Sequence, residues 1–406
     1  MKTLSLCFRI HQPMLLTIYR FFNMGIDNNY LDDARNRALM QRSTAQVFLP
    51  TNTMLLDIIN ATDGKFRVSF YLSGLVVEQM RSYAPDALQS FRDLAATGCV
   101  EFVAGTYSAS LAALANEDEF RLEAAKHAAM IKEEFGQTPT AFFNTALLYS
   151  DVIGETVADM GYHTMLAEGA KHLLGWKSPN YVYANPMNQK LRLMLRNYRL
   201  SDDIMFRFSD RRWSEWPLTA EKYIDWIDGD RGEVVNICTD YSVFGLWQKA
   251  DSGIFDFFRA FVMQSIASDR IRFATVSDNA AAHQPIGVLY ANNEVTWADE
   301  ERDLSAWLGN ELQNEAFGKL YAQREKVHSL GDHDMEHVWE FLQTADHFYW
   351  MATKWFADDG RQSGENPYPS SYEAFINYMN VLSDFINELS RRTVEKEKTR
   401  TEVTHV

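Results

Sequence analysis

The chain is poor in cysteine, has no long apolar stretch and carries no excess of positive charge. Its three cysteines, Cys7, Cys99 and Cys238, lie far apart within or beside apolar runs. This spacing is typical of reduced core thiols and not of a disulfide framework, and no Cys-x-x-Cys or Cys/His pattern suited to a metal is present. No apolar run reaches the roughly 20 residues of a membrane span, so no membrane partner is expected.

The net charge and the first residues of the chain exclude further classes of function. Asp and Glu number 55 against 39 Lys and Arg, which gives a formal net charge of -16. A chain this acidic repels nucleic-acid phosphates and favours a neutral or cationic partner, so nucleic acid is excluded as a partner. The opening stretch MKTLSLCFRIHQP holds one lysine and too few apolar residues for a secretory signal. We therefore expect a cytoplasmic protein.

The pattern of apolar residues predicts an α/β fold followed by helices. Short β-rich runs alternate with amphipathic helical segments up to about residue 285, which indicates repeated β-α units around a parallel sheet closed as a barrel. The last third has a helical period throughout. We predict a barrel domain over residues 1–290, a helical domain packed on it over 291–392, and a frayed tail over 393–406. The strand runs are TLSLCFRI, FRVSFYL, CVEFVAG, TAFFNT, HTMLAEG, VYAN with LRLMLRN, VVNICTD and RIRFATVSD.

Reactive groups of a parallel barrel lie where strands end. Two predicted strand ends, and one block between the barrel and the helices, carry candidate residues. His11 ends the first strand and Asp240 ends VVNICTD, while Trp297 and Asp299 open the block WADEERDLSAWLGN. An indole beside carboxylates suits sugar binding. Each residue also has a structural interpretation: a histidine satisfied at a strand end, an aspartate that caps a helix, and a tryptophan of the core.

One strand end lacks the reactive residue that its position calls for. The run AFFNTALLYS places an aromatic pair and then Asn144 and Thr145 at the expected carboxyl end of a strand, but Ala146 follows. Alanine offers neither a proton nor a lone pair.

Several long phrases, in order along the chain, resemble the α-amylase branch of glycoside hydrolase family 57. They run from residue 4 to about residue 390. The phrases are HQP at 11–13, FFNTALLYSD, TDYSVFG, WADEERDLSAWLGN, HLLGWKSPNYVY, LRNYRLSDDIMFRFSDRRWSEWPLTAEKY and QTADHFYWMATKWF.

The resemblance implies an incomplete seven-stranded (β/α) barrel, a C-terminal helical domain and retaining action on α-glucans without a metal in the chemistry. It places Asp240 at the family's acid/base position and Ala146 at the position of its nucleophilic glutamate. Neighbouring family positions are also changed: Gly105 and Ala109 stand where Glu and His are usual. Ser242, Leu246 and Trp247 replace the tail of the acid/base motif, and Leu15, Thr17 and Ile18 replace basic residues.

We therefore predict a catalytically degenerate protein of glycogen or starch metabolism that binds an α-glucan or maltooligosaccharide. The alternative is an active glycosidase or transglycosidase with a rearranged mechanism that uses Asp240, with Asp202, Asp203 or Asp299 as further carboxylates. No cofactor and no metal site are expected, while a protein partner in glycogen metabolism and the oligomeric state stay open. The predicted substrate-binding residues are His11, Gln12, Trp247, Trp297, Asp299, Asp346 and His347.

Overall fold

The computed structural model describes residues 1–354 and 366–404, and it begins with a curled parallel sheet. Seven parallel strands follow the order β3-β2-β1-β8-β7-β5-β4, while β11 pairs with β1 and β6 lies antiparallel to β7. The strands are β1 (Lys2–Ile10), β2 (Val68–Leu72), β3 (Val100–Phe102), β4 (Ala141–Phe143), β5 (Thr164–Glu168), β6 (Val182–Ala184), β7 (Arg192–Arg196), β8 (Val234–Asp240), β9 (Phe244–Gly245), β10 (Gln248–Lys249) and β11 (Ile271–Phe273).

The sheet curls until its two edge strands touch at one point. Beyond β3, Ala104 forms a parallel bridge with Phe142 of β4, in which the Ala104 N–H donates to Ala141 at 2.9 Å. The barrel that the sequence predicted is confirmed, with seven strands and a minimal seam. All nine residues of β1 are buried, as expected for a central strand of a parallel sheet that is covered on both faces.

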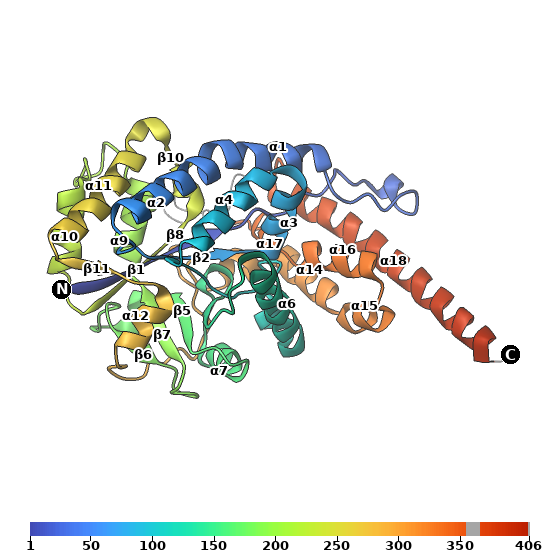
Figure 1. Ribbon diagram of the computed structural model, residues 1–406. Helices are drawn as coiled ribbons and strands as arrows, with labels where there is room; N and C mark the ends of the chain where they lie inside the picture. The colour runs from blue at the N-terminus through green and yellow to red at the C-terminus, as the bar shows by residue number, and fades with distance from the viewer. Residues whose placement is uncertain (355–365, 405–406) are drawn as a thin grey trace.

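Helices cover the outside of the sheet in the first part of the chain (Figure 1). Their ends follow local capping rules: the Asn116 side chain accepts the N–H of Glu119 at the start of α6, and Gly136 ends that helix at φ 69°. The helices of this part of the chain are α1 (Asp33–Ser43), α2 (Leu49–Ala61), α3 (Gly74–Tyr83), α4 (Pro85–Ala96), α5 (Ala112–Ala115), α6 (Glu117–Phe135), α7 (Asp151–Asp159), α8 (Lys171–Leu174), α9 (Tyr198–Asp202), α10 (Ala220–Gly229), α11 (Ile254–Ala267) and α12 (Val276–Ala282).

The remaining helices gather beside the barrel, and the last of them runs out to the C-terminus (Figure 1). They are α13 (Ser305–Leu308), α14 (Glu311–Tyr321), α15 (Arg324–Leu330), α16 (His333–Leu342), α17 (Ala345–Tyr349) and α18 (Ser371–Thr404). Among the described residues, no helix is both long and apolar enough to cross a bilayer.

Helix α18 continues through most of the segment for which the sequence predicted a frayed tail. It reaches Thr404, and polar contacts accompany it as far as Lys396. Arg391 pairs with Glu388 and Glu395 on the helix surface, and the Lys396 Nζ donates to the Leu330 carbonyl at 2.6 Å.

Candidate functional site

Ala146 lies just past the carboxyl end of β4, in a 3-10 turn over Thr145–Leu147. Its backbone is left-handed, at φ 47° and ψ 37°, and Leu147 follows at φ 57°. The Ala146 carbonyl accepts the N–H of Trp297 at 2.9 Å, which ties this turn to the loop that leads into the C-terminal helices. Only 4% of Ala146 is exposed, so its methyl group points into packed surroundings.

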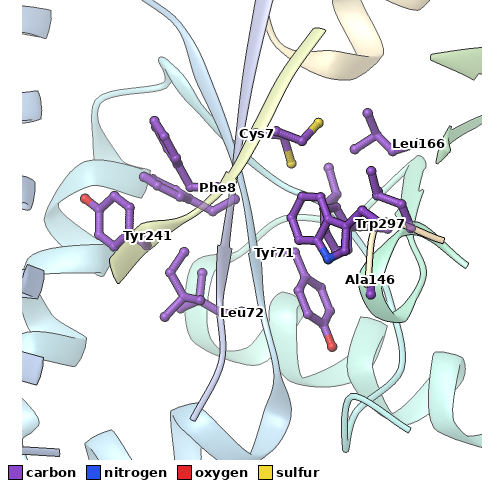
Figure 2. Close-up of a cluster of buried hydrophobic side chains, with 14 of the residues drawn as sticks. Cys7, Phe8, Tyr71, Leu72, Ala146, Leu166, Tyr241 and Trp297 are labelled. Atoms are coloured by element: carbon purple, nitrogen blue, oxygen red, sulfur yellow. The ribbon is translucent and has the colours of Figure 1, made fainter. Parts of the chain in front are cut away.

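Aromatic rings fill the space around this turn. Figure 2 shows Ala146 beside the rings of Trp297 and Tyr71. Phe143 stacks on Tyr71 at 5.1 Å and meets Trp297 edge-on at 5.6 Å. A Cβ at Gly105 would lie 2.4 Å from the Tyr71 ring and 2.5 Å from the Phe143 carbonyl oxygen, so this backbone leaves no room for a side chain at position 105.

Asp240, at the end of β8, forms a buried ion pair with a residue of the neighbouring strand. The Arg9 guanidinium donates to its Oδ2 at 3.0 Å, and the Ser242 N–H donates to its Oδ1 at 2.9 Å. Arg9 and Asp240 are register partners of β1 and β8, so the pairing of the strands itself aligns the two charges. Both carboxylate oxygens are therefore engaged.

His11 lies between the barrel and the C-terminal helices. Its Nε2 is 3.1 Å from Asp346 Oδ2 and its Nδ1 is 2.8 Å from Ser73 Oγ. Burial lowers the pKa of His11. A neutral ring that donates from Nε2 to the carboxylate accepts a hydrogen bond from the Ser73 hydroxyl at Nδ1. Burial likewise lowers the pKa of His347 to about 4, and its Nε2 donates to the Phe341 carbonyl at 3.0 Å.

The other predicted binding residues occupy separate places. The Gln12 amide donates to Gln79 Oε1 at 2.7 Å within the protein, while Trp247 is half-buried and stacks on Phe206 at 5.9 Å. Trp297 is fully buried. Asp299 pairs with Lys354 and accepts the backbone N–H groups of the turn that follows it.

The structure thus brings the side chains of Arg9, His11, Asp240 and Asp346 together in one polar cluster. Arg9 was not predicted as a site residue. Its signal in the sequence was a charge at the end of an otherwise apolar strand run.

A second charged cluster lies at the ends of β5 and β7, and of its charged members the sequence had indicated only Asp202, as a candidate carboxylate. Arg196 donates to Glu168 Oε2 at 3.2 Å, to Asp202 and to the Cys238 carbonyl, and its guanidinium lies 5.0 Å from the Trp297 ring centroid. Arg302 donates to the other Asp202 oxygen at 3.1 Å. Burial raises the pKa of Glu168, although both arginines oppose the shift.

A cavity of about 650 Å³ opens beside this cluster. Asp202 and Arg302 form one side and residues of α8 another, and Trp176, the residue after Gly175 of the lining, is 85% exposed. The lining consists of Lys171, His172, Gly175, Tyr198, Asp202, Arg207, Glu300 and Arg302.

These features define a (β/α)7-barrel protein whose candidate site lies where the strands end, against a set of C-terminal helices. Residues 5–292 match the model of glycosyl hydrolase family 57, and the chain belongs to that family. A protein of Methanocaldococcus jannaschii with the name "Putative alpha-amylase" is 36% identical over 396 residues, which cover 93% of this chain and 83% of that protein.

More distant relatives share the family or the fold. The alpha-amylase of Pyrococcus furiosus is 24% identical over 242 residues, which are 55% of this chain and 34% of that enzyme. A family 57 branching enzyme of Thermococcus kodakaraensis superposes with a TM-score of 0.69 at 11% identity, over 97% of this chain and 91% of that one. The alpha-amylase of Thermotoga maritima gives 0.65 at 11% identity, over 96% and 94%.

Proposed function

We propose that the chain binds α-glucans without hydrolysing them. The relatives are named as alpha-amylases or a branching enzyme, whose substrates are α-glucans. One observation carries the non-hydrolytic part: the position after β4 holds a buried methyl group at Ala146, while the carboxylate of Asp240 is committed to Arg9.

Retaining hydrolysis needs two carboxyl groups about 5 to 5.5 Å apart, one to attack the anomeric carbon and one to transfer a proton. Ala146 cannot attack. Asp240, which already accepts hydrogen bonds from Arg9 and from the Ser242 N–H, is poorly suited to protonate a leaving group.

We place the glucan in the cavity beside Asp202 and Arg302. Tyr198 lines this cavity, and the exposed Trp176 follows Gly175 of the lining and offers a second aromatic face to a glucan that extends past it. The charged lining offers donors and acceptors to sugar hydroxyls. Such a lining suits a neutral polyhydroxylated ligand.

The hydrolysis test compares the wild type with Ala146→Glu and with Ala146→Gln as a matched control, each incubated for a long time with maltooligosaccharides and glycogen. We expect no new reducing ends from any of the three, because restoring one carboxyl leaves Asp240 paired with Arg9. Turnover by the wild type would overturn the non-hydrolytic part of the proposal.

Binding is tested by affinity electrophoresis in glycogen gels and by calorimetry with maltoheptaose. Loss of a stacking indole weakens binding by roughly 2- to 10-fold or more, so Trp176→Ala should migrate faster in glycogen than the wild type. The control Tyr372→Ala, which removes an exposed aromatic side chain of α18, should migrate as the wild type does. Equal retardation of all three proteins would place the ligand elsewhere, and no retardation of the wild type would end the binding proposal.

The second candidate is an active glycosidase or transglycosidase with a rearranged mechanism. One observation favours it: Glu168 has a raised pKa and shares Arg196 and Arg302 with Asp202, which lines the cavity. Two neighbouring carboxyl groups in different environments are a pairing that acid/base catalysis uses. This candidate requires product release that is lost in Asp202→Asn or Asp240→Asn.

A further inference from the structure

A second cavity, of about 470 Å³, lies between the barrel and the C-terminal helices. It is lined by residues of α3, α6 and α16, among them Glu78, Lys126, His337 and Glu340. Helices α3 and α6 belong to the part of the chain that covers the sheet, and α16 belongs to the C-terminal set. The cavity is separate from the one in which we place the glucan.

Three side chains in this cavity bring one possible ligand atom each close to the others. His337 Nδ1 is 3.7 Å from Glu78 Oε2 and 3.7 Å from Glu340 Oε2, and the three ligand atoms all lie within 4.8 Å of one another. These separations are too long for hydrogen bonds. The two separations of 3.7 Å are close to the edge of a coordination tetrahedron with metal–ligand distances of about 2.0 to 2.2 Å, which is roughly 3.3 to 3.6 Å.

The second carboxylate oxygen of each glutamate, Oε1 of Glu78 and of Glu340, accepts a hydrogen bond from another side chain. The Tyr107 hydroxyl donates to Glu78 Oε1, and Lys126 donates to Glu340 Oε1 while its Nζ lies 4.1 Å from the Tyr107 ring centroid. Each carboxylate is thus oriented through one oxygen and presents the other. Donors of this kind orient metal ligands from the outer shell.

The charge of the cavity matches a divalent cation. Its lining contains four glutamates against one arginine and one lysine, a net charge of -2 before the histidines are counted. His333, one helical turn before His337 on α16, also lines the cavity and offers a further imidazole.

We propose that Glu78, His337 and Glu340 bind a divalent transition-metal ion of the zinc class. An imidazole with carboxylates suits zinc and its neighbours, whereas magnesium and calcium sites are built from oxygen alone. Because Glu78 comes from α3 and the other two ligands from α16, the ion clamps the C-terminal helices to the barrel. Ser73, just before α3, and Asp346, on the helix after α16, both contact His11. The bound ion therefore also links the two segments that hold His11 in place.

Calorimetric titration of the metal-free full chain with Zn²⁺ tests the proposal, with Co²⁺ absorption as an independent report on coordination. We expect saturable binding near one ion per chain. Glu78→Gln and His337→Gln should weaken it at least about 10- to 100-fold, the range found even for outer-shell changes, and Tyr107→Phe should weaken it by up to that amount. Glu133→Gln, which changes another glutamate of the same lining, should bind like the wild type.

Unfolding midpoints measured in the presence of a chelator establish whether the metal-free variants are folded. If His337→Gln is not folded, Glu78→Gln alone provides the test. The proposal is overturned if the wild type shows no saturable binding, or if both ligand variants bind Zn²⁺ as the wild type does.

Discussion

At the scale of single residues, the turn that holds Ala146 retains a conformation that its side chain does not favour. Ala146 and Leu147 are successive non-glycine residues with left-handed backbones. This conformation costs an L-residue roughly 1 to 2 kcal/mol, and such strain is concentrated at functional sites. The hydrogen bond from Trp297 to the Ala146 carbonyl helps to hold it.

Replacing Ala146 by glycine should therefore cost little stability. Loss of a buried methyl costs about 0.8 kcal/mol, and relief of the left-handed strain offsets this and the chain-entropy cost. Ala124→Gly is the control, because Ala124 is equally buried but lies within α6, where glycine adds about 1 kcal/mol. Urea unfolding should show a cost near zero for the first variant and about 2 kcal/mol for the second. Equal costs would argue against strain at position 146.

The pair of Arg9 and Asp240 should behave as a coupled unit. Arg9→Met leaves a buried carboxylate without its cation, and removal of one partner of a buried pair costs about 3 to 5 kcal/mol. Adding Asp240→Asn should return a large part of that loss, since no buried charge is then left unpaired. A double-mutant cycle measured by urea unfolding checks this, and strictly additive single changes would contradict it.

At the scale of elements, one carboxylate joins α6 to the C-terminal helices. Glu119, in the first turn of α6, is almost fully buried and accepts hydrogen bonds from Arg324, His328, Trp339 and Gln343. All four donors come from α15, α16 or the residue that follows α16. A short stretch of one barrel helix therefore fixes the position of two others.

The contribution of His328 to stability should depend on pH. Its hydrogen bond and charge interaction with Glu119 raise the pKa of His328 against the effect of burial. A raised pKa gives stability that is present below the unfolded value of about 6.5 and is lost as pH rises through the folded value. His328→Gln should accordingly lower the urea midpoint more at pH 6 than at pH 9. A loss that is the same at both pH values would contradict the assignment.

The elements were largely predictable because periodicity and strand composition are local. Every apolar run predicted as a strand is one, and the helical last third is confirmed. Within the candidate site, the family motifs indicated the positions of Ala146 and Asp240, which lie at or just past the ends of β4 and β8. Arg9 pairs with Asp240 across 231 residues, and Glu168 meets Arg196 only because β5 and β7 are neighbours. Such contacts depend on the order of strands, which no single run contains.

At the scale of the whole molecule, the residues after β1 are fastened to the last helix. Asp384 of α18 accepts the Tyr19 hydroxyl at 3.0 Å, the Tyr30 hydroxyl at 2.7 Å and the Gly25 N–H at 2.7 Å. Asp384 is 3% exposed. Because they share these hydrogen bonds, the docking of α18 and the ordering of this N-terminal loop depend on each other.

Asp384→Ala should loosen both partners at once. Hydrogen bonds to a charged group contribute roughly 1.5 to 3 kcal/mol each, so we expect a loss of at least about 3 kcal/mol and faster amide exchange at Gly25. Glu395→Ala, on the same helix, removes a surface pair with Arg391 and should cost no more than about 1 kcal/mol. Unchanged exchange at Gly25 in Asp384→Ala would show that the loop is held by other contacts.

The position of β1 in the middle of the sheet also affects how the protein folds during translation. The edge of β1 that receives β8 emerges first, and its partner is translated more than 200 residues later. At about 5 to 20 residues per second, that edge waits roughly 10 to 50 seconds for β8. During translation, the nascent chain exposes an apolar strand edge that chaperones can bind and that other chains can pair with, so the yield of folded protein should depend on the speed of synthesis.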